Sequence, residues 1–71
     1  MTYPPPEKID FTDKELAAIR LLLEGKSTQE IALQLGVSTR GVEYHLTGIY
    51  EKLGVYSRAE AIIKLIHLFE K

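Results

Sequence analysis

Three segments of this 71-residue chain fit the pattern S/T-x-x-E, which is typical of helix starts. They begin at Thr12, Ser27 and Ser57. In such a capping box the hydroxyl accepts a hydrogen bond from the third helical N–H, and the glutamate accepts one from the N–H of the cap residue. Ser38 is a fourth candidate cap, without the glutamate. So many helix starts in so short a chain favour a bundle of short helices.

The expected helix ends are equally clear. Gly25, Gly36 and Gly54 each follow an apolar stretch, where glycine can take the left-handed conformation that ends a helix. No stretch alternates between polar and apolar residues as a strand would. We therefore expect an all-α fold with four helices, at about residues 13–24, 28–35, 39–53 and 58–70.

Apolar side chains recur along the first three of these helices at intervals that place them on one face. We expect these faces to form the core, with Leu16, Ile19, Leu22 and Leu23 from the first helix, Ile31, Ala32 and Leu35 from the second, and Val42, Leu46, Ile49 and Leu53 from the third. Ile9 and Phe11 are expected to fold back onto this core.

The last helix carries more apolar surface than one packing face needs. Its apolar residues cover an arc of roughly 220°, whereas a helix packed on one side needs a stripe only a little over 100° wide. We expect the surplus to meet a second copy of the chain, since most homo-oligomers close by a two-fold axis. The expected interface residues are Ala61, Ile62, Leu65, Leu68 and Phe69. The alternative is that Ile9 and Phe11 cover the surplus within one chain.

Residues 27–53 contain two of the helical patterns, separated only by Gly36-Val37-Ser38. Two short helices joined by so tight a turn are typical of a helix-turn-helix. In that motif the second helix lies in the major groove of DNA and the first supports it.

Composition narrows the other possibilities. The chain has no cysteine, so disulfides and thiolate metal sites are excluded. No run of about 20 apolar residues predicts a membrane span, so we expect a cytoplasmic protein that does not contact membranes. No nucleophile–base set, paired acid site or phosphate loop predicts an enzyme. His45 and His67 have no partner at ligand spacing, so we expect no metal or cofactor.

The chain is expected to divide into a tail and one domain. Residues 1–10, with Pro4-Pro5-Pro6, are expected to form an extended tail or linker, or alternatively a site for a proline-binding partner. Residues 11–71 are expected to form the domain.

The stretch from residue 11 to residue 62 resembles the DNA-binding domain of the LuxR/GerE family. The resemblance is carried by short motifs in the same order, namely Thr12 with Glu15, Leu22 with Glu24-Gly25, Glu30-Ile31-Ala32, Leu35-Gly36-Val37-Ser38, Val42, His45-Leu46, Ile49-Tyr50, Lys52-Leu53-Gly54-Val55 and Ser57-Arg58. It implies a four-helix domain that binds double-stranded DNA as a dimer and regulates bacterial transcription. It also implies that a sensor or receiver domain normally precedes this domain. The chain is then either an excised effector domain or a short stand-alone regulator.

The matching positions assign candidate roles on DNA. Base contacts are expected from Glu43, Tyr44 and Thr47, and phosphate contacts from Thr28, Gln29, Arg40, Lys52, Ser57 and Arg58. The alternative for Arg40 is an ion pair with Glu43. The alternative for the three expected base-contacting residues is that they form a solvent-exposed helix surface without contacting DNA. The resemblance implies a structural or backbone-contacting role for His45, and we interpret Tyr50 and Tyr56 as packing residues.

Charge sets this chain apart from the usual DNA-binding pattern. Its net charge is -1 and its pI is about 6.1, and Glu43 stands where relatives often have a basic residue. Residues 26–58 carry a net charge of only +1. Weak non-specific DNA affinity is therefore expected. There are two alternatives to a LuxR/GerE-type regulator. One is a protein-interaction module on the same fold, and the other is the helix-turn-helix of a sigma factor, which the presence of a fourth helix disfavours.

Overall fold

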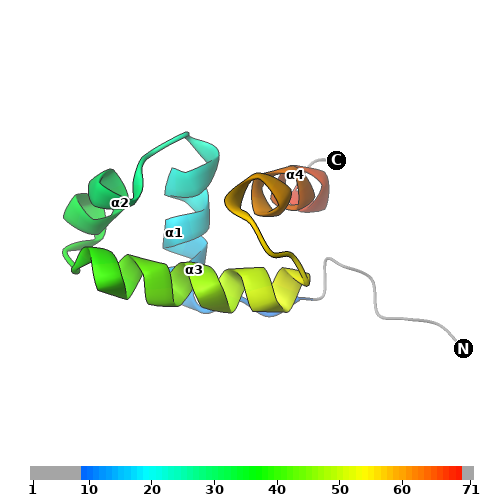
Figure 1. Ribbon diagram of the computed structural model, residues 1–71, viewed down its shortest axis with the longest axis horizontal. Coiled ribbons are helices and arrows are strands. Elements are labelled where there is room, and N and C mark those ends of the chain that lie inside the picture. Colours follow the sequence, from blue (N-terminus) through cyan, green and yellow to red (C-terminus); the bar gives the residue numbers. More distant parts are fainter. Residues whose placement is uncertain (1–8, 70–71) are drawn as a thin grey trace, which may run out of the picture.

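The computed structural model describes residues 9–69 and contains four helices and, within those residues, no strand. They are α1 (Asp13–Leu23), α2 (Thr28–Leu35), α3 (Thr39–Leu53) and α4 (Arg58–Phe69). In Figure 1 the long helix α3 runs along the lower edge, α1 crosses behind it, and α2 and α4 lie above its two ends. The expected all-α fold is confirmed. Most of the expected tail, residues 1–8, lies outside the described residues.

The expected capping boxes explain where the helices begin. At α1 and α2, Thr12 and Ser27 accept from the third helical N–H, while Glu15 and Glu30 accept from the cap N–H. Ser38 caps α3 through the N–H of Gly41 at 3.0 Å. At α4 the Ser57 hydroxyl accepts from the N–H of Glu60, as expected.

The third box differs from expectation in one hydrogen bond. The carboxylate of Glu60 accepts from the N–H of Tyr56, one residue before the cap, and not from Ser57 itself. The bond therefore holds the end of the α3–α4 connection against the first turn of α4.

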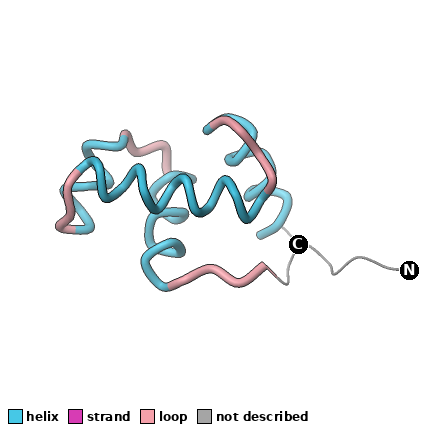
Figure 2. The backbone as a smooth tube through the Cα atoms, turned by 60° about the horizontal axis from the view of Figure 1, so that its bottom comes forward, coloured by secondary structure: helices cyan, strands magenta, loops and turns pink. Residues whose placement is uncertain are grey.

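The turn between α2 and α3 has the geometry of the predicted helix-turn-helix. Gly36 ends α2 with φ +70°, a left-handed conformation that glycine adopts without a steric penalty. Only Gly36, Val37 and Ser38 separate the two helices, and Figure 2 shows this connection as a short bend between them. Because the turn is short and Gly36 fixes its backbone conformation, the position of α2 determines the direction of the α3 axis.

The core lies where the four helices meet. The α3 stripe is buried as expected, at Val42, Leu46, Ile49 and Leu53. Ile31 and the small Ala32 of α2 are also buried, and Ile9 and Phe11 pack against the core from outside. The packed structure therefore extends to Ile9, two residues before the expected domain boundary.

The face of α1 that packs on the core differs from the expected one. Ile19 and Leu22 are buried, but Leu16 and Leu23 are exposed, and Ala18 and Leu21 are buried in their place. The apolar run in α1 is nearly continuous, so its periodicity alone did not define a face. Glu15, one turn before Ile19, lies on the inner face and is 7% exposed, the only charged residue buried among those described.

Helix α4 corrects two of the five expected interface residues. Ala61 and Leu65 are fully buried between α4 and the other helices, so they cannot contact a second chain. Ile62 and Leu68 are partly buried, and Phe69 is exposed. Ile63 and Ile66, which were not expected at the interface, are exposed beside Phe69. Ile9 and Phe11 thus leave an apolar face of α4 uncovered.

Candidate nucleic-acid interface

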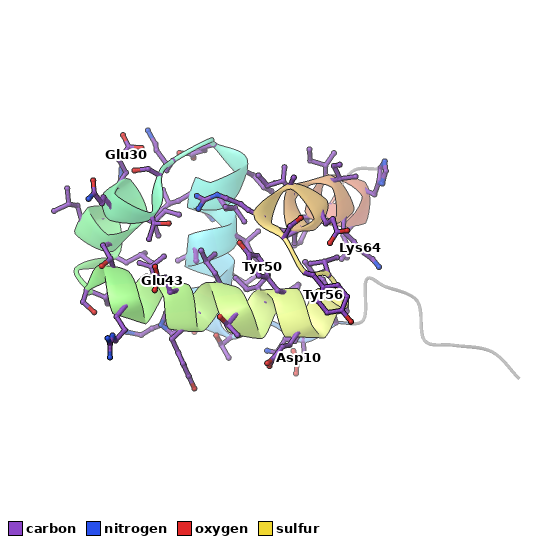
Figure 3. The ribbon with its side chains drawn as sticks, viewed as in Figure 1. Asp10, Glu30, Glu43, Tyr50, Tyr56 and Lys64 are labelled. Carbon is purple, nitrogen blue, oxygen red and sulfur yellow. The ribbon has the colours of Figure 1, made fainter. Side chains whose placement is uncertain are left out.

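The side of α3 opposite the buried stripe is polar and open to solvent. The exposed side chains on this side are Arg40, Glu43, Tyr44, Thr47 and Glu51. They include all three expected base readers. Figure 3 shows Glu43 on the N-terminal half of this helix, with Tyr50 and Tyr56 near its other end. The buried stripe packs against α1, α2 and α4, so the exposed side chains are held on a fixed scaffold.

Arg40 and Glu43 stand one turn apart without pairing. Among the described residues the one salt bridge joins Lys52 and Glu15, and no hydrogen bond within them involves the side chain of Arg40 or Glu43. The structure thus lacks the ion pair that was the alternative for Arg40. Both charged groups are available to an incoming ligand.

The aromatic residues around α3 have different surroundings. Tyr44 is exposed, and its ring meets the ring of the half-buried His45 edge-on at 5.5 Å between centroids. Tyr50 packs against the core as interpreted. Tyr56 does not, since it is 95% exposed in the connection to α4, where it lines a shallow hollow together with Thr47, Tyr50, Glu51, Gly54 and Val55.

Arg58 joins the N-termini of α2 and α4. Its guanidinium donates to the carbonyl oxygen of Lys26 at 2.7 Å and to the hydroxyl of Thr28 at 3.1 Å. Thr28 is the first residue of α2 and Arg58 the first of α4, so the two helix starts are held side by side. Helix N-termini carry free N–H groups and a partial positive charge, which attract anions such as phosphate. Gln29 and Ser57 are exposed at these same two starts.

The capping glutamate of α2, Glu30, lowers the positive potential near the start of that helix. The backbone N–H of Ser27 donates to the Glu30 carboxylate at 2.8 Å, and this bond holds the pKa of Glu30 below its ordinary value. The carboxylate is therefore charged at neutral pH. Glu30, together with Glu43 and Glu51 on α3, offsets the positive charge that the arginines give to the candidate DNA-binding surface.

Lys52 has a different environment from the other expected phosphate contacts. Its ammonium lies 2.6 Å from Oε1 of Glu15 and 2.8 Å from the carbonyl oxygen of Asp10, and 5.8 Å from the centre of the Phe11 ring. Asp10 lies below the C-terminal end of α3 in Figure 3. The ammonium therefore ties α3 to α1 and to the segment that precedes α1. Because the Glu15 carboxylate neutralises its charge, Lys52 is not proposed as a phosphate contact, whereas the Arg58 guanidinium bonds only uncharged oxygens.

Glu15 is held as a carboxylate by its neighbours. Burial raises its pKa, but the hydrogen bonds from Lys52 and from the N–H of Thr12, with the charge of Lys52, lower the pKa by more than that. The net pKa is below its ordinary value of 4.5. Glu15 is thus charged at neutral pH although it is 7% exposed.

Gly48 explains how α3 approaches so near to this carboxylate. A Cβ at Gly48 would stand 2.8 Å from Oε2 of Glu15, closer than carbon and oxygen can pack. The sequence reasoning missed both residues as part of the α1–α3 contact. A glycine inside a helix, which costs about 1 kcal/mol relative to alanine, was the available signal of a close approach.

Two further features bear on the function. Within the part of the chain that the structure describes, no group of three His, Asp or Glu side chains could hold a metal ion. Among the same residues, no helix has the length and apolar character of a membrane span.

The comparisons with known proteins agree with this geometry. Residues 10–65 match the family of bacterial regulatory proteins named after LuxR. The chain is 36% identical to the spore germination protein GerE of Bacillus subtilis over 60 residues, which cover 84% of this chain and 81% of GerE. It is 39% identical to the response regulator Rre1 of Synechocystis over 86% of this chain and 26% of that protein, and 45% identical to the transcriptional regulatory protein YdfI of Bacillus subtilis over 73% of this chain and 24% of that protein.

A solved structure shares the fold. The VqmA dimer of Vibrio cholerae, a LuxR-type receptor studied in the absence of its target DNA, superposes with a TM-score of 0.82 at 28% identity, over 92% of this chain and 29% of the VqmA chain. This chain thus spans about a quarter of Rre1, YdfI and VqmA, but four-fifths of GerE. The order of its motifs, its four helices and these matches show that the chain belongs to the LuxR/GerE family of bacterial regulatory proteins.

Proposed function

We propose that this domain binds double-stranded DNA in a sequence-specific manner and regulates bacterial transcription. The observation that carries the proposal is the exposed polar side of α3, flanked by the two helix N-termini that Arg58 holds together. A helix of this kind fits the major groove, while the two joined helix N-termini beside it bind phosphates that border the groove. The mechanism is docking, with no chemical step.

The contacts divide into two classes. Glu43, Tyr44 and Thr47 are proposed to reach base edges, because they are exposed on α3 and directed away from the core. Phosphate contacts are proposed for Arg40, Gln29, Ser57 and Arg58, with Thr28 contributing at the start of α2. Phosphate contacts set the position of a protein on DNA, whereas base contacts select the sequence.

The domain is proposed to act as a dimer through α4. Ile63, Ile66 and Phe69 form an exposed apolar face on α4, and Ile62 and Leu68 are partly buried against the core. With so few cations facing DNA, one domain gains little from phosphate contacts. Two joined domains would place their α3 helices in successive major grooves about 34 Å apart.

The place of the domain in a longer protein is a further part of the proposal. Rre1 and VqmA are named a response regulator and a receptor, and the matched part is about a quarter of each. A signal-receiving domain, on the same chain or a separate one, is therefore the proposed source of control. The cytoplasm, where bacterial DNA lies, is the proposed location.

Selection from a random duplex library, followed by a salt titration on the enriched sequence, tests the proposal. The proposed function predicts enrichment of one motif, with two half-sites about one helical turn apart. If no sequence is enriched at low salt, sequence-specific DNA binding is refuted, and the domain is better described as a protein-interaction module on this fold.

A further inference from the structure

Glu43 gives the exposed side of α3 an unusual chemistry for a DNA reader. Its side chain is exposed on the second turn of α3, and among the described residues nothing donates to it. An ionised carboxylate only accepts hydrogen bonds. Where the groove excludes water, the direct partner that DNA can offer this group is a donor on a base edge.

The surrounding residues do not change that requirement. Arg40 lies one turn earlier without pairing to Glu43, and the ammonium of Lys52 is bonded to Glu15 and Asp10. Thr47, one turn later on the same side, accepts or donates with equal ease. Among the described residues, therefore, no cation pairs with the Glu43 carboxylate in this structure.

The major groove offers few donors. Guanine presents the acceptors N7 and O6, and thymine presents the acceptor O4 and a methyl group. Cytosine presents its N4 amino group, and adenine presents an N6 amino group beside the acceptor N7. A carboxylate facing adenine therefore meets one donor and one repelling lone pair on the same base, whereas cytosine presents the donor with no acceptor of its own in the groove.

We infer that the operator of this protein carries a cytosine at the position facing Glu43, recognised through its N4 amino group. This inference rests on the proposed function. It names the base that the site selects and identifies Glu43 as the residue that rejects guanine and thymine. Because an unpaired carboxylate in the groove is costly, Glu43 also lowers the affinity for every sequence without that amine.

The size of the effect follows from known side-chain–base pairs. One good pair discriminates against the wrong base by about 5- to 150-fold. Replacing the facing cytosine with guanine or thymine should weaken binding of the wild-type protein within that range.

Parallel selections with the wild-type protein and with Glu43→Gln test the inference. The amide of glutamine both donates and accepts, which matches N7 and N6 of adenine. The cytosine that the wild type enriches should therefore become adenine in the selection with Glu43→Gln. Glu51→Gln, which removes the same charge two turns later on α3, should keep cytosine at that position.

A chemical change in the DNA tests the named atom. Replacing the N4 amino group of that cytosine by hydrogen should weaken wild-type binding by about 5- to 150-fold. The same change should have a much smaller effect on Glu43→Ala, whose selectivity at this position is already lost. The comparison between the two proteins removes the effect of the modified base on the duplex itself.

The outcomes separate this inference from the proposed function. If the wild type enriches a motif but the position that responds to Glu43→Gln carries guanine or thymine, or no position responds, the inference is wrong and the proposed function stands. If the wild type enriches no motif at all, both are wrong. Cytosine in the wild type, with the switch to adenine in the variant, supports both.

Discussion

The ammonium of Lys52 on α3 lies 2.6 Å from the carboxylate of Glu15 on α1, although the two residues are 37 apart in sequence. Glu15 also accepts the N–H of Thr12 at the start of α1 and lies against the backbone of α3 at Gly48. One carboxylate therefore caps α1, pairs with α3 and limits how closely the two helices approach. Because α3 is the proposed reading helix, its placement depends on a residue that never touches DNA.

This pair should make the domain sensitive to acid. The pKa of Glu15 is lowered in the folded protein, so its stabilising effect is complete above the ordinary value of 4.5 and is lost as the pH falls through the lowered pKa. We expect the free energy of unfolding, measured by urea denaturation, to fall below pH 4.5. In Lys52→Met, burial still raises the pKa of Glu15 and only the hydrogen bonds with Thr12 lower it, so the fall should be smaller. An equal fall in both proteins would show that the pair is not responsible.

Two glycines in α3 should respond to alanine in opposite ways. A Cβ at Gly48 would lie 2.8 Å from Oε2 of Glu15, a buried carboxylate that the hydrogen bonds from Lys52 and Thr12 hold in place. Gly48→Ala should therefore destabilise the fold by about 1–3 kcal/mol despite the better helix propensity of alanine. At Gly41 the nearest atoms would be 3.5 Å away, an ordinary contact, so Gly41→Ala should stabilise the fold by up to about 1 kcal/mol. Thermal unfolding of the two variants measures both effects. Two changes of the same sign would contradict the close approach at Gly48.

Arg40→Ala should weaken DNA binding about equally on all sequences. A phosphate contact carries no base information, and removing one should lower the slope of log affinity against log salt by about 1. Arg20→Ala, at an exposed position on α1, is the matched control and should leave the slope unchanged. Anisotropy titrations on the enriched duplex and on a scrambled one at several salt concentrations measure the slope. A change in base preference with an unchanged slope would place Arg40 on a base edge.

Substitutions at two neighbouring residues of α4 should affect folding and self-association separately. Leu65 is fully buried, so Leu65→Ala should destabilise the fold by about 2–5 kcal/mol. Ile66 is 47% exposed, so Ile66→Glu should leave the unfolding transition nearly unchanged while abolishing self-association in sedimentation equilibrium. If Ile66→Glu associates as the wild type does, the apolar face of α4 is not the dimer interface.

The helix boundaries and the α3 core stripe were predictable because their causes are local. A serine or threonine three residues before a glutamate starts a helix, and the spacing of Val42, Leu46, Ile49 and Leu53 defines a single face. These patterns therefore also predict which side of α3 is exposed, and that side carries the candidate base-contacting residues.

The features that sequence reasoning missed depend on contacts between distant segments. The nearly continuous apolar run of α1 is compatible with several faces, and only packing selects the face with Glu15. Nothing local to Lys52 indicates that its ammonium meets a carboxylate 37 residues earlier. In α4, likewise, the apolar arc was visible, but which part faces the core depends on where α1 and α3 lie.

The central claim is that the polar side of α3, with the joined starts of α2 and α4, faces DNA. Mapping backbone amide shifts by NMR during titration with the enriched duplex tests it directly. We predict the largest changes from Thr39 to Thr47 and in the first turns of α2 and α4, with smaller changes on α4 from dimerisation. The largest changes in α1, with the exposed residues of α3 unaffected, would contradict the account.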